Sequence, residues 1–191
     1  MKILLCGDSF SYDHKIAHSW TTKLSMLHQV DNLSQCGCSE YKIKLQIQSQ
    51  SMSDYDAVLI FHTSPYRIYL NRQSSLHIND SHKDADLLFA DVEHHRHHNQ
   101  LAQHAYDYFK HIFDADYYCY MHNLICSDIH QNTKSNNVHH FTAFDYSKLY
   151  QFDNTLTDLY NTWTSHQGDV NHLSPTGHDV FFETITGILA Q

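Results

Sequence analysis

The sequence predicts an α/β fold, a three-layer α/β/α sandwich around a short and mostly parallel sheet. Short apolar runs that end at glycine or at polar residues recur along the chain and indicate buried strands. Between them lie segments in which apolar residues repeat at a spacing of three or four, as on one face of a helix. Strands that alternate with helices are typical of parallel sheets covered by helices on both faces.

The N-terminal segment predicts a strand, a turn and a helix. Residues 2–6 form a short apolar run that stops at Gly7, which favours a buried parallel strand over a helix. Residues 15–27 carry apolar side chains at helical spacing. The turn between the strand and the helix therefore spans residues 7–14. The apolar positions of the helix are Ile16, Trp20, Leu24 and Leu27.

The middle of the chain predicts two more strands and a helix. Residues 30–33 indicate the second strand, and residues 39–50 the second helix, although apolar and polar side chains alternate along part of it. Residues 57–61 are five consecutive apolar residues and predict the third strand, which should end before Pro65. A long irregular stretch is expected from there to about residue 85.

The C-terminal part predicts a helix, two short strands and a final helix. Residues 91–113 have a helical pattern, and residues 117–121 and 138–144 indicate the strands. The last helix has clear start signals, because Ser174 can cap it and Pro175 suits its first turn. Its apolar face comprises Val180, Phe181, Ile185 and Leu189.

Length and composition predict one folded domain that spans residues 1–191. A chain of 191 residues has the usual size of a single domain and can bury a core without disulfides. Hydrophobic residues make up 41% of it and aromatic residues 13%, which is unlike a disordered chain. We find no internal repeat, linker or change of composition that would separate two domains.

Charge and hydropathy argue against two classes of partner. The chain has 21 acidic and 12 basic residues and no cluster of Lys and Arg, so we do not expect it to bind nucleic acid. It lacks the run of about 18 apolar residues that a membrane span needs, so we expect no membrane partner. The N-terminal apolar run is too short for a signal peptide. Together with five cysteines, which form no even framework, this predicts a cytoplasmic protein with reduced thiols.

The tetrapeptide Gly-Asp-Ser-Phe at residues 7–10 follows the first strand directly. Ser9 would lie at the carboxyl edge of the sheet, where open α/β folds bind their ligands, and is a candidate nucleophile. Asp8 is expected to brace this turn through hydrogen bonds to the backbone. An ordinary turn, in which Ser9 only caps the next helix, is the alternative.

A second candidate segment, residues 168–174, precedes the last helix. A serine hydroxyl becomes a good nucleophile when a neutral imidazole accepts its proton, and a carboxylate must hold that imidazole. In this segment His172 can serve as the general base and Asp169 can orient it. With Ser9 these two residues would form a Ser-His-Asp triad.

These segments resemble sequence blocks of the SGNH (GDSL-type) hydrolases. Residues 7–10 resemble the first block, and residues 169–178, Asp-x-x-His-Leu-Ser-x-x-Gly-His, resemble the last. Residues 32–39 are similar to the second block, whose glycine N–H is an oxyanion donor, and Gly37 takes that place. The resemblance implies flavodoxin-like layering and a serine esterase that needs no cofactor.

The chain departs from this family after the third strand. The family has an asparagine there that donates a hydrogen bond to the oxyanion, whereas this chain has none between Phe61 and Arg67. Simple register places Ser64 in that position, with Thr63 as the second candidate donor. Loss of one such donor typically lowers the rate by about 10²- to 10³-fold. Arg67 could bind an anionic group of the substrate or lie in solvent.

The resemblance implies hydrolysis of short acyl esters, such as O-acetyl groups on carbohydrates, with no metal. Two other functions stay open. One is a binding or structural protein that keeps the fold without activity. The other is a metal-binding protein built on the histidine-rich residues 93–98, where His94 and His98 would share a helix face. A solvent-exposed polar face is the favoured interpretation of this tract, because we place no further ligands beside it.

Overall fold

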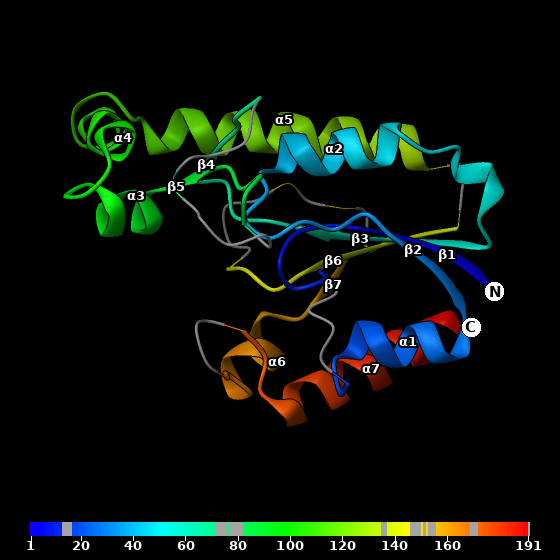
Figure 1. Ribbon diagram of the computed structural model, residues 1–191. Coiled ribbons are helices and arrows are strands. Elements are labelled where there is room, and N and C mark those ends of the chain that lie inside the picture. Colours follow the sequence, from blue (N-terminus) through cyan, green and yellow to red (C-terminus); the bar gives the residue numbers. More distant parts are fainter. Residues whose placement is uncertain are drawn as a thin grey trace.

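The central element is a five-stranded, wholly parallel sheet (Figure 1). The computed structural model describes residues 1–12, 17–71, 76, 82–134, 137–145, 150, 152, 156–168 and 172–190. Within them the strand order is β2-β1-β3-β6-β7, so the chain starts near the middle of the sheet and builds outward in both directions. The strands are β1 (Lys2–Cys6), β2 (Gln29–Asn32), β3 (Ala57–His62), β6 (Val138–Thr142) and β7 (Leu156–Asp158).

Helices cover both faces of this sheet, which confirms the predicted α/β/α sandwich (Figure 1). On one face α1 (Trp20–Leu27) packs against α7 (Pro175–Leu189), with α6 (Tyr160–Ser165) beside α7. On the other face α2 (Glu40–Gln48) packs against α5 (Ala115–Thr133).

Two apolar cores lie on the two faces of the sheet. Along β1 the side chains alternate between them, because successive residues of a strand point to opposite faces. Ile3 and Leu5 join the α1/α7 side, whereas Leu4 and Cys6 join the α2/α5 side. All four are fully buried, which explains why this strand is an unbroken apolar run in the sequence.

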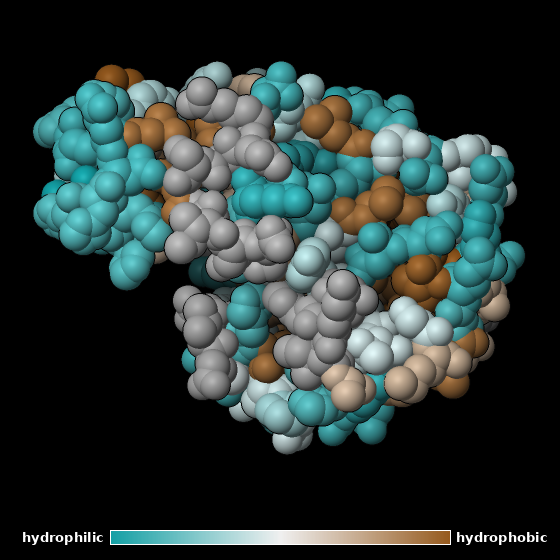
Figure 2. Space-filling view, in the orientation of Figure 1, coloured by the Kyte–Doolittle hydropathy of each residue, from teal (hydrophilic) through white to brown (hydrophobic). Residues whose placement is uncertain are grey.

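An extension projects from one end of the sandwich (Figure 1). It consists of a two-stranded antiparallel sheet followed by two helices. A short 3-10 helix, η1 (Met52–Asp54), precedes β3 and is not part of the extension. The extension has a small apolar core of its own but a largely hydrophilic surface on the side seen in Figure 2. None of the described helices is long and apolar enough to cross a membrane. The elements of the extension are β4 (Arg67–Ile68), β5 (Leu87–Leu88), α3 (Phe89–His95) and α4 (Gln100–His111).

The predictions for residues 2–6, 30–33, 39–50 and 57–61 are confirmed to within about two residues at each end. A strand at 138–144 and a helix that starts after a Ser174 cap are confirmed as well. The helix predicted over 15–27 starts only at Trp20, because the Ser19 side chain accepts a hydrogen bond from Thr22 N and caps it there.

Two predictions are wrong. Residues 117–121 lie in helix α5 and form no strand. Their aromatic side chains favour strands locally, but the Asp114 side chain caps a helix here by accepting from Asp116 N and Tyr117 N. The single helix predicted over 91–113 is two helices, because Asn99 caps a new one after α3 has ended.

Gly7 is needed where β1 leaves the sheet, because neighbouring atoms leave no room for a Cβ there. A Cβ added there would lie 2.6 Å from Phe61 Cβ and would collide with Ser11 Oγ. We expect Gly7→Ala to lower the free energy of unfolding by about 1–3 kcal/mol, the usual cost of overpacking. Urea unfolding measures this change. Gly187→Ala in α7 is the matched control, since no atom lies within 4 Å of its added Cβ. Equal stability of the two variants would contradict the prediction.

Candidate active site

The loops that follow β1, β2 and β3 meet at the carboxyl edge of the sheet. β1 pairs in parallel with both neighbours, so the three chains leave the sheet side by side. Gln35 N donates to Gly7 O at 3.1 Å, which ties the β2 loop to the β1 loop. Arg67 Nη1 donates to Cys38 O at 2.9 Å, which ties the β3 loop to the β2 loop. The parallel topology therefore brings together residues 7–10, 32–39 and 63–67, which were candidate site segments in the sequence.

The turn that carries Ser9 is held from within by Asp8. Asp8 Oδ1 accepts a hydrogen bond from Phe10 N at 3.0 Å, and Asp8 O accepts one from Ser11 N at 3.2 Å. This confirms the bracing role predicted for Asp8, whose side chain is fully buried. Ser9, in contrast, is only partly buried, so its position leaves part of it within reach of a ligand.

His172 lies close to this turn although it is near the other end of the chain. Its ring centroid is 6.0 Å from that of Phe10, the residue next to Ser9. A short loop presents it, in which Gly168 N donates to His172 O at 2.7 Å and Ser174 N donates to His166 O. Asp169 lies outside the described residues. The Ser-His-Asp triad therefore stays a prediction, with its serine and histidine segments adjacent.

Arg67 is buried against the same turn. Its Nη2 lies 3.4 Å from Asp8 Oδ2, and its side chain is 7% exposed. The alternative in which Arg67 lies in solvent is therefore wrong, because the buried Asp8 carboxylate supplies a partner for its charge. Burial raises the pKa of Asp8, while the Arg67 guanidinium acts in the opposite direction. Binding of an anionic substrate group by Arg67 stays a prediction.

Thr63 connects the edge of the sheet to its interior. Its hydroxyl donates to Asp8 Oδ2 at 2.9 Å, and its N–H donates to Glu40 Oε2 at 3.0 Å. Its carbonyl oxygen lies 2.9 Å from His122 Nε2. A hydroxyl has one proton to donate, and here Asp8 receives it. The Thr63 side chain thus supports the Ser9 turn through Asp8.

The other two predicted oxyanion donors lie on the flanking loops. Ser64 Oγ is 3.4 Å from Tyr66 N and lines a cavity of about 270 Å³. Gly37 has a φ of 71°, and a Cβ there would lie 2.7 Å from Ala85 Cβ, so this turn needs glycine. Oxyanion binding by either residue stays a prediction.

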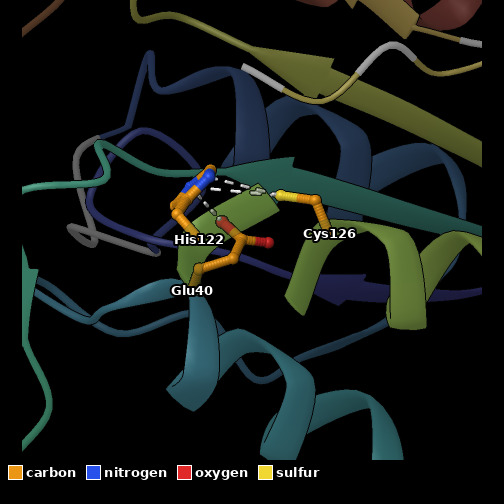
Figure 3. A group of neighbouring side chains, drawn as sticks. All are labelled: Glu40, His122 and Cys126. Carbon is orange, nitrogen blue, oxygen red and sulfur yellow. Dashed lines mark hydrogen bonds and ion pairs between the residues drawn. The ribbon is translucent and has the colours of Figure 1, made fainter. Parts of the chain in front are cut away.

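A second group of polar side chains is buried between the sheet and helices α2 and α5 (Figure 3). Glu40 Oε1 accepts from His62 Nδ1 at 2.6 Å, and Glu40 Oε2 lies 3.3 Å from His122 Nε2. Cys126 Sγ is 3.5 Å from His122 Nδ1, and His62 Nε2 is 2.9 Å from His140 Nδ1. The sequence carries no local signal for this group, because its members come from different elements and meet only in the fold.

Neighbouring charges and burial set the state of this group. Burial opposes ionisation of Glu40, but His62 and His122 together hold its pKa below its ordinary value. Burial and the nearby His62 lower the pKa of His140 to about 2, so this imidazole is neutral. Glu40 is accordingly a buried carboxylate whose nearest partners are histidines.

Neither the cysteines nor the histidine tract offers a competing reactive site. All five thiols are buried, and burial raises the pKa of Cys6 to about 12, with the same effect on Cys36. Such thiols are poor nucleophiles. The prediction that His94 and His98 share a helix face is wrong, because α3 ends at His95. Within the described part of the chain, no histidine of this tract belongs to a group of three converging metal ligands.

Comparisons with protein-family models and with curated proteins find no match for this chain. Its own residues and their geometry therefore carry the functional argument.

The buried Asp8–Arg67 pair predicts a large effect on stability. In Asp8→Asn the Arg67 guanidinium would keep its place without a carboxylate, which typically costs about 3–5 kcal/mol for a buried pair. We expect the free energy of unfolding in urea to fall by that amount. The control is Asp128→Asn, which removes the more exposed Lys44–Asp128 pair and should cost less than about 1 kcal/mol. Similar losses in the two variants would argue against this role of Asp8.

Proposed function

We propose that this protein is a serine ester hydrolase that resembles the SGNH hydrolases. Ser9 would be its nucleophile, His172 its general base, and Asp169 the carboxylate that orients His172. The observation that supports the proposal most strongly is that the His172 ring lies against the ring of Phe10, the residue next to Ser9. Two segments from opposite ends of the chain are thereby adjacent at the edge where open α/β folds bind ligands.

The chemistry follows from these roles. Ser9 Oγ attacks the ester carbonyl carbon while His172 takes the hydroxyl proton. The tetrahedral intermediate collapses, and His172 returns that proton to the departing alcohol. Water then attacks the acyl-enzyme, with His172 again as the base, and releases the acid and free Ser9. The N–H groups of Ser9 and Gly37 and the Ser64 hydroxyl are the proposed donors to the oxyanion.

The surroundings of the turn favour a polar substrate with a small acyl group. A cavity of about 560 Å³ lies beside the loops that follow β1 and β2, and most of its lining is polar. Tyr12 adds an aromatic ring to that lining, which suits a sugar face. The resemblance to the SGNH hydrolases implies an O-acetyl ester, on a carbohydrate among other carriers, and a polar cavity next to the Ser9 turn is compatible with that class. The lining residues are Tyr12, Asn32, Leu33, Ser34, Gln35, Cys36, Lys83 and Asp84.

Covalent labelling tests the nucleophile directly. A fluorophosphonate probe should label Ser9, and Ser9→Ala should lose the label because the attacking oxygen is gone. His172→Gln should lower kcat by about 10⁴- to 10⁶-fold, since the serine would have no base. Peptide mass spectrometry and initial rates measure the two effects. Ser53→Ala and His104→Gln, both exposed and outside the edge loops, are the controls. A wild-type protein that stays unlabelled, or a label that survives Ser9→Ala, would reject the proposal.

Acyl length and pH test the substrate class and the base. We expect kcat/KM for p-nitrophenyl acetate to exceed that for the octanoate and palmitate esters, because the side chains of the edge loops, residues 34–38 and 63–67, are mostly small or polar. The same constant should rise from acid to neutral pH and then level off, since only a neutral His172 can accept the Ser9 proton. Rates measured from about pH 5 to 9 examine both points. A preference for palmitate would exclude the short-acyl class, and a rate independent of pH would exclude His172 as the base.

A further inference from the structure

Three metal-ligating side chains converge beneath the candidate active site. Glu40 begins α2, and His122 and Cys126 lie one turn apart on α5, which packs against α2. Their ligand atoms all lie within 4.8 Å of one another, and all three side chains are buried (Figure 3). We propose that Glu40, His122 and Cys126 bind one divalent transition-metal ion, with Zn²⁺ preferred. This inference is independent of the proposed hydrolase activity.

The distances suit an ion placed between these atoms. Tetrahedral Zn²⁺ holds its oxygen, nitrogen and sulfur ligands about 3.3–3.6 Å apart, given its usual bond lengths of about 2.0–2.3 Å. Here Glu40 Oε2 is 3.3 Å from His122 Nε2. Cys126 Sγ is 3.5 Å from His122 Nδ1 and 4.0 Å from Nε2. One ion binds one nitrogen of the ring, so binding through Nε2 requires Cys126 Sγ to move closer and Nε2 to exchange its contact with Thr63 O for the ion.

The surrounding residues hold the carboxylate ligand in place. His62 Nδ1 lies 2.6 Å from Glu40 Oε1, and His140 Nδ1 lies 2.9 Å from His62 Nε2 on the far side of that ring. Thr63 N donates to Glu40 Oε2. Metal sites depend on such outer hydrogen bonds, which fix the direction of each ligand before the ion arrives. His62 is accordingly a positioning residue for Glu40.

Charge balance gives a physical reason for an ion here. The nearest partners of the buried Glu40 carboxylate are His62 and His122, while the buried Arg67 guanidinium is paired with Asp8. On binding, the Cys126 thiol would release its proton to solvent, so that a divalent cation faces one carboxylate and one thiolate. The sum of these three charges is zero. A neutral centre of this kind avoids the cost of burying an uncompensated charge.

The ligand set also selects the kind of ion and allows its entry. Thiolate and imidazole ligands favour Zn²⁺ over Mg²⁺ or Ca²⁺, which prefer oxygen. Glu40 and His122 line the cavity of about 270 Å³ between α2, α5 and the β3 loop, which provides a path from the surface. Three protein ligands leave a fourth position of the tetrahedron for water from that cavity.

Metal titration of the whole, untagged chain tests the site. After chelation and dialysis, the protein should bind one Zn²⁺ per chain, and Co²⁺ should give a thiolate-to-cobalt charge-transfer band. Cys126→Ser should abolish that band. Cys119→Ser, which changes another buried thiol of α5, should retain it. His62→Asn should weaken Zn²⁺ binding by about 10- to 100-fold, as expected for a residue that orients a ligand.

Three outcomes would overturn the proposal. They are a folded wild-type chain that binds neither ion stoichiometrically, a thiolate band that survives Cys126→Ser, and binding lost in His94→Gln/His98→Gln but retained in Cys126→Ser. Zinc X-ray absorption of the wild-type complex needs no variant to fold. A spectrum with one sulfur ligand would support the site, and a spectrum without a sulfur ligand would reject it. Fluorophosphonate labelling of Ser9 reports on the hydrolase proposal separately, so failure of one proposal is distinguishable from failure of the other.

Discussion

The buried Asp8 carboxylate is the constraint on which the edge of the sheet depends. Its oxygens accept hydrogen bonds from Phe10 N and Thr63 Oγ1 and lie beside the Arg67 guanidinium. These partners come from the turn after β1, the end of β3 and the start of β4. A buried charge is tolerated only when it is paired and hydrogen-bonded, so all three segments must keep these positions. The partly buried Ser9 is thereby presented on a turn whose interior is fixed.

The same constraint bears on the departure from the SGNH pattern. The first residue after β3 has its hydroxyl directed at Asp8, its N–H at Glu40 and its carbonyl at His122. Each polar group of Thr63 therefore has a partner, and its hydroxyl proton is donated to Asp8. Ser64 is the other hydroxyl of this loop, and it does not bond to Asp8 in these contacts. If Ser64 replaces the family's asparagine, it does so with a freely rotating hydroxyl where an amide has a fixed direction. A slower enzyme is the physical consequence of such an exchange.

The sequence predicts what depends on local pattern and misses what depends on distant contacts. The β1 and β3 strands were predictable from unbroken apolar runs, and α7 from its Ser174 cap, because both signals lie within a few residues. The bracing role of Asp8 was predictable for the same reason. Glu40 gave no such signal, since an acidic residue in the first turn of a helix is ordinarily exposed. Its partners follow only from the packing of α2 on β3 and α5. The spacing of His122 and Cys126 was hidden because the preceding aromatic residues favour a strand.

Thr63 is the direct link between the two chemical centres. Thr63 donates to Glu40 through its N–H and to Asp8 through its hydroxyl, so a change at Glu40 can reach the Ser9 turn by this route. Such an effect changes the geometry of the turn, whereas the proton transfers assigned to His172 take place on the opposite side of that turn, toward α7. An ion held by Glu40, His122 and Cys126 would therefore bear on the proposed nucleophile by supporting Thr63 and, through it, Asp8. Metal content and nucleophile labelling can be measured separately, and Thr63 is a residue through which the two proposed sites are linked.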